Sequence, residues 1–132
     1  RELPARRIRR YCDMARKETA NPFARVRDAA AGLPGVEQGT SYGTPALKVR
    51  GKMFVRMKED GETLVVMCPL DEKDMLMEMD PKVYFETDHY KGWPAVLMRL
   101  KKISTRKLQH RLEQAWRLKA PKALIAEFDK GR

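Results

Sequence analysis

Within the stretch 42–58 the chain comes to alternate, residue by residue, between apolar and basic side chains. From Leu47 on, the odd positions hold leucine, valine, glycine and methionine, and all but one of the even positions hold lysine or arginine. A period of two is typical of a β-strand with one buried face, and Gly51 marks a turn in the middle of the run. The pattern predicts a β-hairpin with one face on a core and cations on the other face.

The turn of this hairpin decides on which side Phe54 lies. A three-residue loop over 50–52 keeps the alternation in step, so that Phe54 shares the solvent face with the cations. A two-residue turn at Gly51-Lys52 would instead bury Phe54 and divide the basic row. The cations could neutralise phosphates beside an aromatic ring that stacks on a base, or they could simply be a solvated strand face that prevents edge aggregation. The predicted nucleic-acid contacts of this row are Lys48, Arg50, Lys52, Arg56 and Lys58.

The 132 residues, 42% of them hydrophobic, suit one compact domain with one core. The longest clear apolar run, 64–68, is far shorter than the roughly 18 residues of a membrane-spanning helix, and no charged-then-apolar leader opens the chain. Cys12 and Cys68 are too few for a disulfide framework and lack the spacing of a zinc or redox motif. These features predict a cytoplasmic protein with no metal and no other cofactor.

Charge is distributed unevenly along the chain, whose formal net charge is +10. Residues 1–58 hold 14 basic and 5 acidic side chains, residues 59–90 hold 2 and 10, and residues 91–132 hold 12 and 3. Such asymmetry favours a polyanionic partner, nucleic acid first and an anionic membrane surface second. The simplest alternative is a basic protein that is merely soluble.

Turn and cap residues divide the chain into a basic N-terminal extension, 1–20, which is flexible or partly helical, and a single domain, 21–130. Asn21-Pro22 caps and opens the first helix of the domain. Asp60-Gly61 predicts a two-residue hairpin turn, and Asp71 predicts the cap of a helix. The strands are predicted at 36–40, 46–50, 53–59, 62–68, 83–87 and 95–100, and the later helices at 72–79, from Ser104 or Thr105 onward, and after Pro121.

Five short motifs follow one another in this order of elements. They are LPGVE at 33–37, KV with GKMF within 48–54, Pro69 after a strand, HYKGW at 89–93, and AWRL at 115–118 before KAPK. Over about residues 23–128 the chain thereby resembles the MmcQ/YjbR-like family of small bacterial proteins. Two departures are Val66-Met67, where members often carry a lysine, and Ala115-Trp116, where they often carry Ser-Tyr.

The resemblance implies an α+β fold, with an N-terminal helix, a curved antiparallel sheet of about five to six strands, and helices packed on one face. It also implies DNA binding, because the family is commonly described as binding DNA through a double-wing arrangement, in which a saddle-shaped sheet meets the duplex. Fold does not fix function, so the resemblance identifies no site by itself.

A second basic group lies where a loop with a tryptophan leads to the end of a strand and the start of a helix. Trp93 is interpreted as a ring that closes the core, with base stacking or ligand gating as the alternative. The sequence contains no helix-turn-helix, zinc-finger or RNA-recognition pattern, so we expect salt-sensitive, poorly selective binding to phosphates. The predicted contacts of this group are Lys91, Trp93, Arg99, Lys101 and Lys102, continued by Arg106 and Lys107.

His89 carries the competing hypothesis of a small-molecule-binding or hydrolytic enzyme, because histidine titrates near neutral pH and Asp88 could orient it if the chain turns there. Cys68 has no histidine partner in sequence and is interpreted as a small buried residue. A third hypothesis is a protein-interaction module, in which the acidic segment 71–80 of one chain meets the basic C-terminal helix of another. The favoured interpretation is a non-catalytic, DNA-binding monomer or weak homo-oligomer that does not bind membranes.

Overall fold

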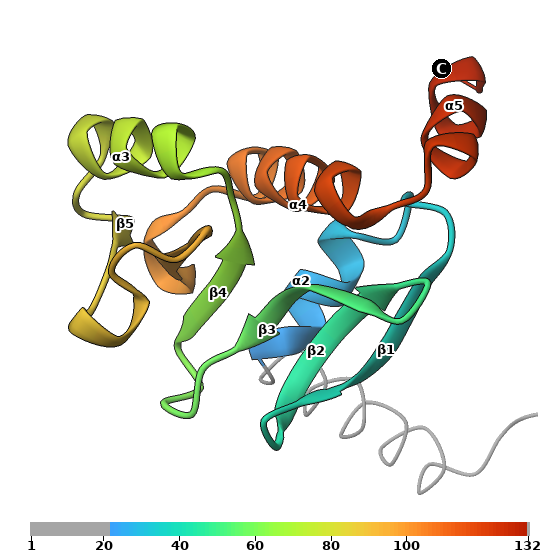
Figure 1. Cartoon of the computed structure of the whole chain (residues 1–132). Coiled ribbons are helices and arrows are strands. Elements are labelled where there is room, and N and C mark those ends of the chain that lie inside the picture. The colour runs from blue at the N-terminus through green and yellow to red at the C-terminus, as the bar shows by residue number, and fades with distance from the viewer. Residues whose placement is uncertain (1–21, 132) are drawn as a thin grey trace, which may run out of the picture.

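The computed structural model describes residues 22–131 and shows a curved, six-stranded antiparallel sheet with helices, an α+β fold as predicted (Figure 1). The predicted extension 1–20, with Cys12, and the predicted cap Asn21 lie outside the described residues. The strand order is β1-β2-β3-β4-β6-β5, so the first four strands form the expected meander. The strands are β1 Val36–Ser41, β2 Thr44–Val49, β3 Lys52–Met57, β4 Thr63–Met67, β5 Tyr84–Phe85 and β6 Ala95–Arg99.

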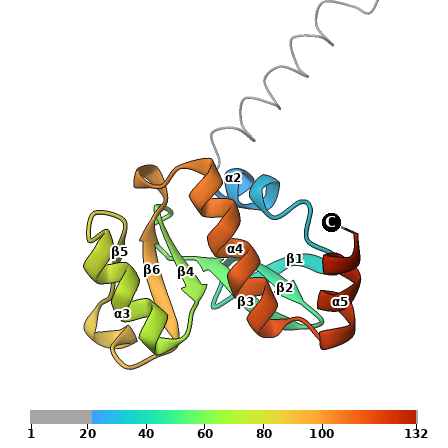
Figure 2. The ribbon, with the colours of Figure 1, turned by 90° about the horizontal axis from the view of Figure 1, so that it is seen from above.

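The helices pack on one face of the sheet, as predicted (Figure 2). They are α2 Pro22–Ala29, α3 Leu70–Met79, α4 Thr105–Lys119 and α5 Lys122–Lys130. Helix α4 crosses β3 and β4 and contacts α2, whereas α3 lies against β5 and β6. Within residues 22–131, no helix is both long and apolar enough to span a membrane.

The main core lies between this face of the sheet and the helices. Trp116 of α4 is fully buried, and its indole Nε1 donates a hydrogen bond to the Pro34 carbonyl at 3.0 Å. Leu108, Leu112 and Ala115 are also fully buried, which confirms the predicted apolar stripe of this helix. An amphipathic helix of this kind is stable because its apolar stripe is removed from water by the sheet.

Of the two predicted helix caps that lie among residues 22–131, one is confirmed and one is wrong. Ser104 caps α4, since its Oγ accepts a hydrogen bond from the Lys107 backbone N–H at 3.3 Å. Helix α3 begins at Leu70, before the predicted cap Asp71, because the Pro69 carbonyl already accepts the Lys73 N–H at 2.8 Å. Asp71 instead lies in the first turn, where a negative charge still interacts favourably with the helix dipole.

The β3–β4 turn is longer than predicted. Lys58 N–H donates to the Thr63 carbonyl at 2.7 Å and closes a four-residue loop over 59–62, which contains the predicted Asp60-Gly61 pair. The Asp60 carboxylate accepts the Glu62 and Thr63 N–H groups, each at 2.9 Å. These two bonds stabilise the wider loop, so the prediction is right in position and wrong in length.

The β2–β3 turn also differs from both predicted geometries. It consists of Arg50 and Gly51, whose φ angles are 50° and 80°, and it leaves Val49 paired with Lys52. Two successive residues with positive φ form the hairpin turn whose twist matches that of the flanking strands. Neither the three-residue loop 50–52 nor the Gly51-Lys52 turn is present.

The two-residue turn reverses the predicted position of Phe54, and a β-bulge follows it: because Lys52 lies opposite Val49, Phe54 falls on the same face as Val49. Lys48 pairs with Met53 and Leu47 with Val55, so Phe54 is the extra residue between the two pairs. The bulge returns Val55 to the core face beside Leu47, so Phe54 and Val55 both point into the core, and the Phe54 side chain is 0% exposed. The expectation that Phe54 shares the solvent face with the cations is therefore wrong.

The predicted strand 83–87 is short. Only Tyr84–Phe85 pairs with β6, and the chain then leaves the sheet for a single 3₁₀ turn, η1, at Asp88–Tyr90. The loop from 86 to 94 thereby runs beside the sheet face that the helices leave uncovered. A second 3₁₀ turn, η2, at Leu100–Lys102 joins β6 to α4.

Candidate functional site

The sheet face opposite the helices holds a groove of about 650 Å³. Strand residues form its apolar floor, among them Val65 and Ala95, which belong to a small apolar cluster separate from the main core. One wall is the β1–β2 turn with Tyr42, and the other is the 86–94 loop with Tyr90 and Trp93. This is a concave, largely apolar site with a few polar groups, which is the usual form of a small-molecule site.

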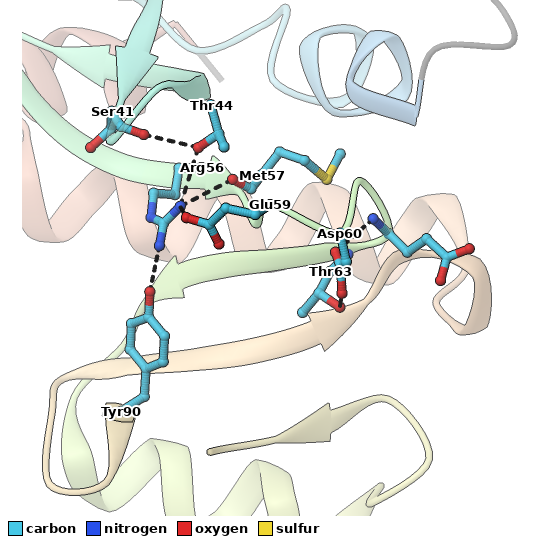
Figure 3. Close-up of polar contacts among 9 residues, drawn as sticks. Ser41, Thr44, Arg56, Met57, Glu59, Asp60, Thr63 and Tyr90 are labelled. Carbon is cyan, nitrogen blue, oxygen red and sulfur yellow. Dashed lines mark hydrogen bonds and ion pairs between the residues drawn. The ribbon is translucent and has the colours of Figure 1, made fainter. Parts of the chain in front are cut away.

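Arg56 lies in this groove and is only 5% exposed, although it was predicted to contact phosphates (Figure 3). Its Nη1 donates to Thr44 Oγ1 at 3.1 Å, to the Met57 carbonyl at 3.2 Å and to Glu59 Oε1 at 3.4 Å. Its Nη2 donates to the Tyr90 hydroxyl at 2.6 Å. Most of this guanidinium group is therefore engaged within the protein.

Tyr42 covers Arg56 from the β1–β2 turn. The Tyr42 ring centroid is 5.1 Å from the Arg56 guanidinium carbon, in a cation–π arrangement. Tyr42 has a φ of 54° and the next residue, Gly43, a φ of 78°. A left-handed backbone is unusual for a residue with a large side chain, so the turn geometry holds an exposed aromatic ring beside the groove.

Lys73 holds the opposite wall in place. This α3 side chain is 1% exposed, and its Nζ donates to the Tyr90 carbonyl at 2.8 Å, to the Trp93 carbonyl at 3.0 Å and to Glu86 Oε2 at 3.0 Å. These three acceptors satisfy all three ammonium donors. Sequence reasoning missed Lys73, and the signal available was a lysine three residues before the buried Leu76 on the same helix.

The loop exposes Trp93, which is 60% exposed at the groove rim rather than in the core. The interpretation of Trp93 as a core residue is thus wrong, and the ring is open to a ligand.

The structure also separates the predicted contacts, because the strand register places them at opposite ends of the sheet. Arg50, Lys52, Lys91 and Trp93 lie at one end, and Lys58, Arg99, Lys101 and Lys102 at the other, with half-buried Lys48 between them.

Two predicted contacts at the β6 end are engaged in local interactions. Arg99 donates to the Pro81 and Lys82 carbonyls, and its guanidinium carbon lies 4.1 Å from the Phe85 ring centroid. Lys101 forms an exposed ion pair with Glu62 at 3.0 Å. Such an exposed pair exchanges readily with solvent and with other anions.

Three further cations at this end are exposed, and their side chains have no hydrogen-bond or ion-pair partner among residues 22–131. They are Lys102, Arg106 and Lys107, at the end of η2 and in the first turn of α4. Arg106 and Lys107 also line a groove of about 470 Å³ between α3 and α4, together with His110 and Arg111. Free positive charge is thus presented by two parts of the predicted site, the start of α4 and the opposite end of the sheet with Arg50, Lys52 and Lys91, and at the start of α4 it coincides with a helix N-terminus.

The groups proposed for catalysis do not form a reactive pair. His89 stacks edge-on against Tyr90, with centroids 5.0 Å apart, and within the described part of the chain it has no hydrogen bond to Asp88. Burial raises the pKa of the Cys68 thiol to about 11, so it is protonated at neutral pH and is a poor nucleophile. Among residues 22–131, no group of three or more His, Cys, Asp or Glu could hold a metal ion.

Comparison with known proteins places this arrangement in a family. Uncharacterized proteins of Mycobacterium tuberculosis and Mycobacterium bovis are 45% identical over 56 residues, which are 42% of this chain and 43% of each relative. The chain thus spans less than half the length of these curated relatives. The crystal structure of Deinococcus radiodurans protein DR2400, from the DUF419 domain family, shares the fold with a TM-score of 0.63 at 17% identity, covering 79% of this chain and 85% of that one.

The resemblance noted from the five motifs is confirmed by a family model. The model for YjbR matches residues 31–118, which contain the whole sheet, both groove walls and nearly all of α4. The chain therefore belongs to the YjbR family.

Proposed function

We propose that this protein binds nucleic acid, DNA in the first place, by contacting phosphates through the start of α4. The observation that carries the proposal is the group of three exposed, unpaired cations Lys102, Arg106 and Lys107. They stand at the N-terminal end of a 15-residue helix, where the helix dipole adds positive potential. We name these three residues the α4 cation group.

The sheet face contributes less than the alternating sequence predicts. Arg56 donates its hydrogen bonds within the protein, and Phe54 cannot stack on a base because it is buried. Arg50 and Lys52 remain exposed, but they lie at the opposite end of the sheet from the α4 cation group. The proposed phosphate contacts therefore lie in the C-terminal basic segment rather than in the hairpin.

Contacts of this kind are electrostatic and should depend steeply on salt. Each phosphate neutralised on duplex DNA contributes a slope of about −0.9 to log K against log salt concentration. The α4 cation group together with Lys101 therefore predicts a slope of about −3 to −4, with little difference between DNA sequences.

The test is fluorescence anisotropy with a labelled duplex across a salt series, on the full chain and on two variants of equal charge. The first, Lys102→Glu/Arg106→Glu/Lys107→Glu, should weaken binding more than tenfold and reduce the salt slope by about 3. Its fold should survive, because glutamate in the first turn favours a helix. The control, Arg50→Glu/Lys52→Glu/Lys91→Glu, should lose much less affinity.

Equal losses in both variants would mean that only net charge matters and would overturn the proposed site. A wild-type protein with a flat salt response would contradict phosphate binding itself. If the control loses more affinity than the first variant, the hairpin end is the contact, as the alternating sequence first suggested.

A further inference from the structure

We propose that the groove on the uncovered sheet face binds a small aromatic carboxylate, with its ring between Tyr42 and Trp93 and its carboxylate at Arg56. The proposal does not depend on nucleic-acid binding, because the groove contains no residue of the α4 cation group. It rests on three features, which are the exposed rings, the open hydrogen-bonding sites of Arg56, and the charge of the lining.

The rings and floor of the groove leave an unusual amount of apolar surface in water. Tyr42 is 83% exposed, and Trp93 is 60% exposed. Met53 and Met67, which also line the groove, are only half-buried. Exposed apolar surface that lines a hollow marks a binding site more often than isolated exposed residues do. The volume of about 650 Å³ is of the size that takes a ligand of one or two fused rings.

The backbone at Tyr42 supports the same conclusion. This turn position favours glycine or asparagine, yet it carries a tyrosine with a φ of 54°. Left-handed backbone at a bulky residue tends to occur where the side chain has a function. Here the conformation holds the ring over the Arg56 guanidinium, so an aromatic ligand that enters the groove meets a ring already in place.

Arg56 offers the ligand hydrogen-bond donors. All its hydrogen bonds use Nη1 and Nη2, so Nε has no partner among the described residues. Among these residues, no buried side-chain nitrogen or oxygen is left unpaired, so Nε must be reachable by solvent. The Tyr90 hydroxyl accepts from Nη2 and keeps its own proton to donate. Nε and this hydroxyl can both donate to one carboxylate.

The charge of the lining favours an anion. Arg56 and Lys119 are cations, whereas Glu59 is the sole carboxylate in the described lining. Glu59 is mostly exposed and contacts Nη1, on the other side of the guanidinium from Nε, so it neutralises Arg56 weakly. A ligand with one negative charge therefore complements the groove better than a neutral or cationic one.

Two larger occupants fit the groove less well. A DNA duplex cannot enter a hollow of this volume, and the groove lies over the central strands β3, β4 and β6, where no sheet edge is free to pair with a peptide. The aromatic carboxylate is the class that uses both the rings and the cation.

The test compares 2-naphthoate with the neutral 2-naphthamide on the full chain. Binding is followed by tryptophan fluorescence, which reports on Trp93 because Trp116 is fully buried, and by amide chemical shifts. We expect the carboxylate to bind at least about fivefold more tightly than the amide, since a hydrogen bond to a charged group is worth that much or more. In Arg56→Gln this preference should fall to about one.

Two ring variants locate the site. Tyr42→Gly removes one wall and relieves the left-handed backbone, and Trp93→Ala removes the other, so both should fold. Each should weaken naphthoate binding about three- to tenfold. Fluorescence follows binding in Tyr42→Gly, and chemical shifts follow it in Trp93→Ala. The control Leu118→Ala removes an exposed apolar side chain outside the groove and should leave the affinity unchanged.

Three results would overturn the proposal. The first is no shift of groove amides at millimolar naphthoate, and the second is equal binding of naphthoate and naphthamide by the wild-type protein. The third is tighter binding of adenosine monophosphate than of naphthoate with the same dependence on Tyr42 and Trp93, which would assign the groove to nucleotides instead. If Arg56→Gln does not fold, the wild-type comparison of the two probes still decides the question.

Discussion

The two faces of the sheet carry alternate residues of the same strands, yet they are stabilised in different ways. The face under α2 and α4 carries the apolar main core, in which Phe54 of β3 and Trp116 of α4 are fully buried. The uncovered face instead has a small apolar cluster and a groove. The only buried charged side chains among residues 22–131, Arg56 and Lys73, both support the walls of that groove.

This contrast teaches that a charged residue at an outward strand position need not be exposed. Arg56 lies on the uncovered face, as its place in the alternation predicts, but the β1–β2 turn and the 86–94 loop cover it. The cation is tolerated because carbonyl, hydroxyl and carboxylate oxygens replace its water. The helical face needs no such partners, since it buries no charge.

The largest change in the free energy of unfolding is expected from a substitution on the sheet face that the helices cover. Phe54→Ala should lower the free energy of unfolding by about 3–5 kcal/mol, because it removes a fully buried ring and leaves a cavity. Urea unfolding measures the change, and Phe54→Leu, which keeps most of the volume, should cost about 1.5 kcal/mol or less. A cost for Phe54→Ala as small as that of the leucine variant would restore the solvent-facing position that strict alternation predicts.

A smaller loss is expected from the lysine that holds the groove wall. Lys73→Met should lower the free energy of unfolding by about 2–3 kcal/mol, because the Tyr90 and Trp93 carbonyls lose their donor and Glu86 loses its cation. Hydrogen exchange of the amides in 86–94 should accelerate more than exchange in β2 and β3. The exposed Lys82→Met is the control and should leave both measurements unchanged, whereas uniform acceleration over the whole sheet would argue against a local role for Lys73.

The smallest effect should come from the exposed ring on the same wall. Trp93→Ala should change the free energy of unfolding by about 1 kcal/mol or less, because most of the ring is in water and its carbonyl remains bonded to Lys73. Thermal unfolding measures the change. The comparison is Trp116→Ala, which should lower the free energy of unfolding by about 3–5 kcal/mol. A large loss in Trp93→Ala would mean that this tryptophan does close a core, and would remove it from the proposed ligand site.

Much of the fold could be predicted from local signals in the chain. The Ser104 cap, the apolar stripe of α4 and the presence of the hairpin are confirmed, because each depends on residues within a few positions of one another, whereas the strict alternation along the hairpin is broken by its turn and its bulge. The predicted nucleic-acid contacts, in contrast, do not form one surface, since these residues are dispersed over two ends of the sheet. Which cations gather depends on strand order and register, and these are not local properties.

The errors at Phe54 and Trp93 have different physical causes. A hairpin turn one residue shorter than the loop 50–52 reverses the side of the Phe54 ring without any change in composition, and the bulge then keeps Val55 on the core face. At Trp93, a lysine 20 positions earlier in the chain holds the backbone of the loop in a position that leaves the indole in water. Neither the geometry of the hairpin nor the position of the loop leaves a periodic pattern in the sequence.

The sequence by itself determined the α+β class, the meander, the basic amphipathic helix and the family, because periodicity, caps and turn residues act over short distances. Only the tertiary structure decided which polar side chains are buried, since Arg56 is covered by contacts that include Tyr90, 34 residues away, and Lys73 finds carbonyl partners 17 and 20 residues away. The alternating run at 42–58 thus specified a hairpin, while the packing of distant loops on that hairpin created the groove.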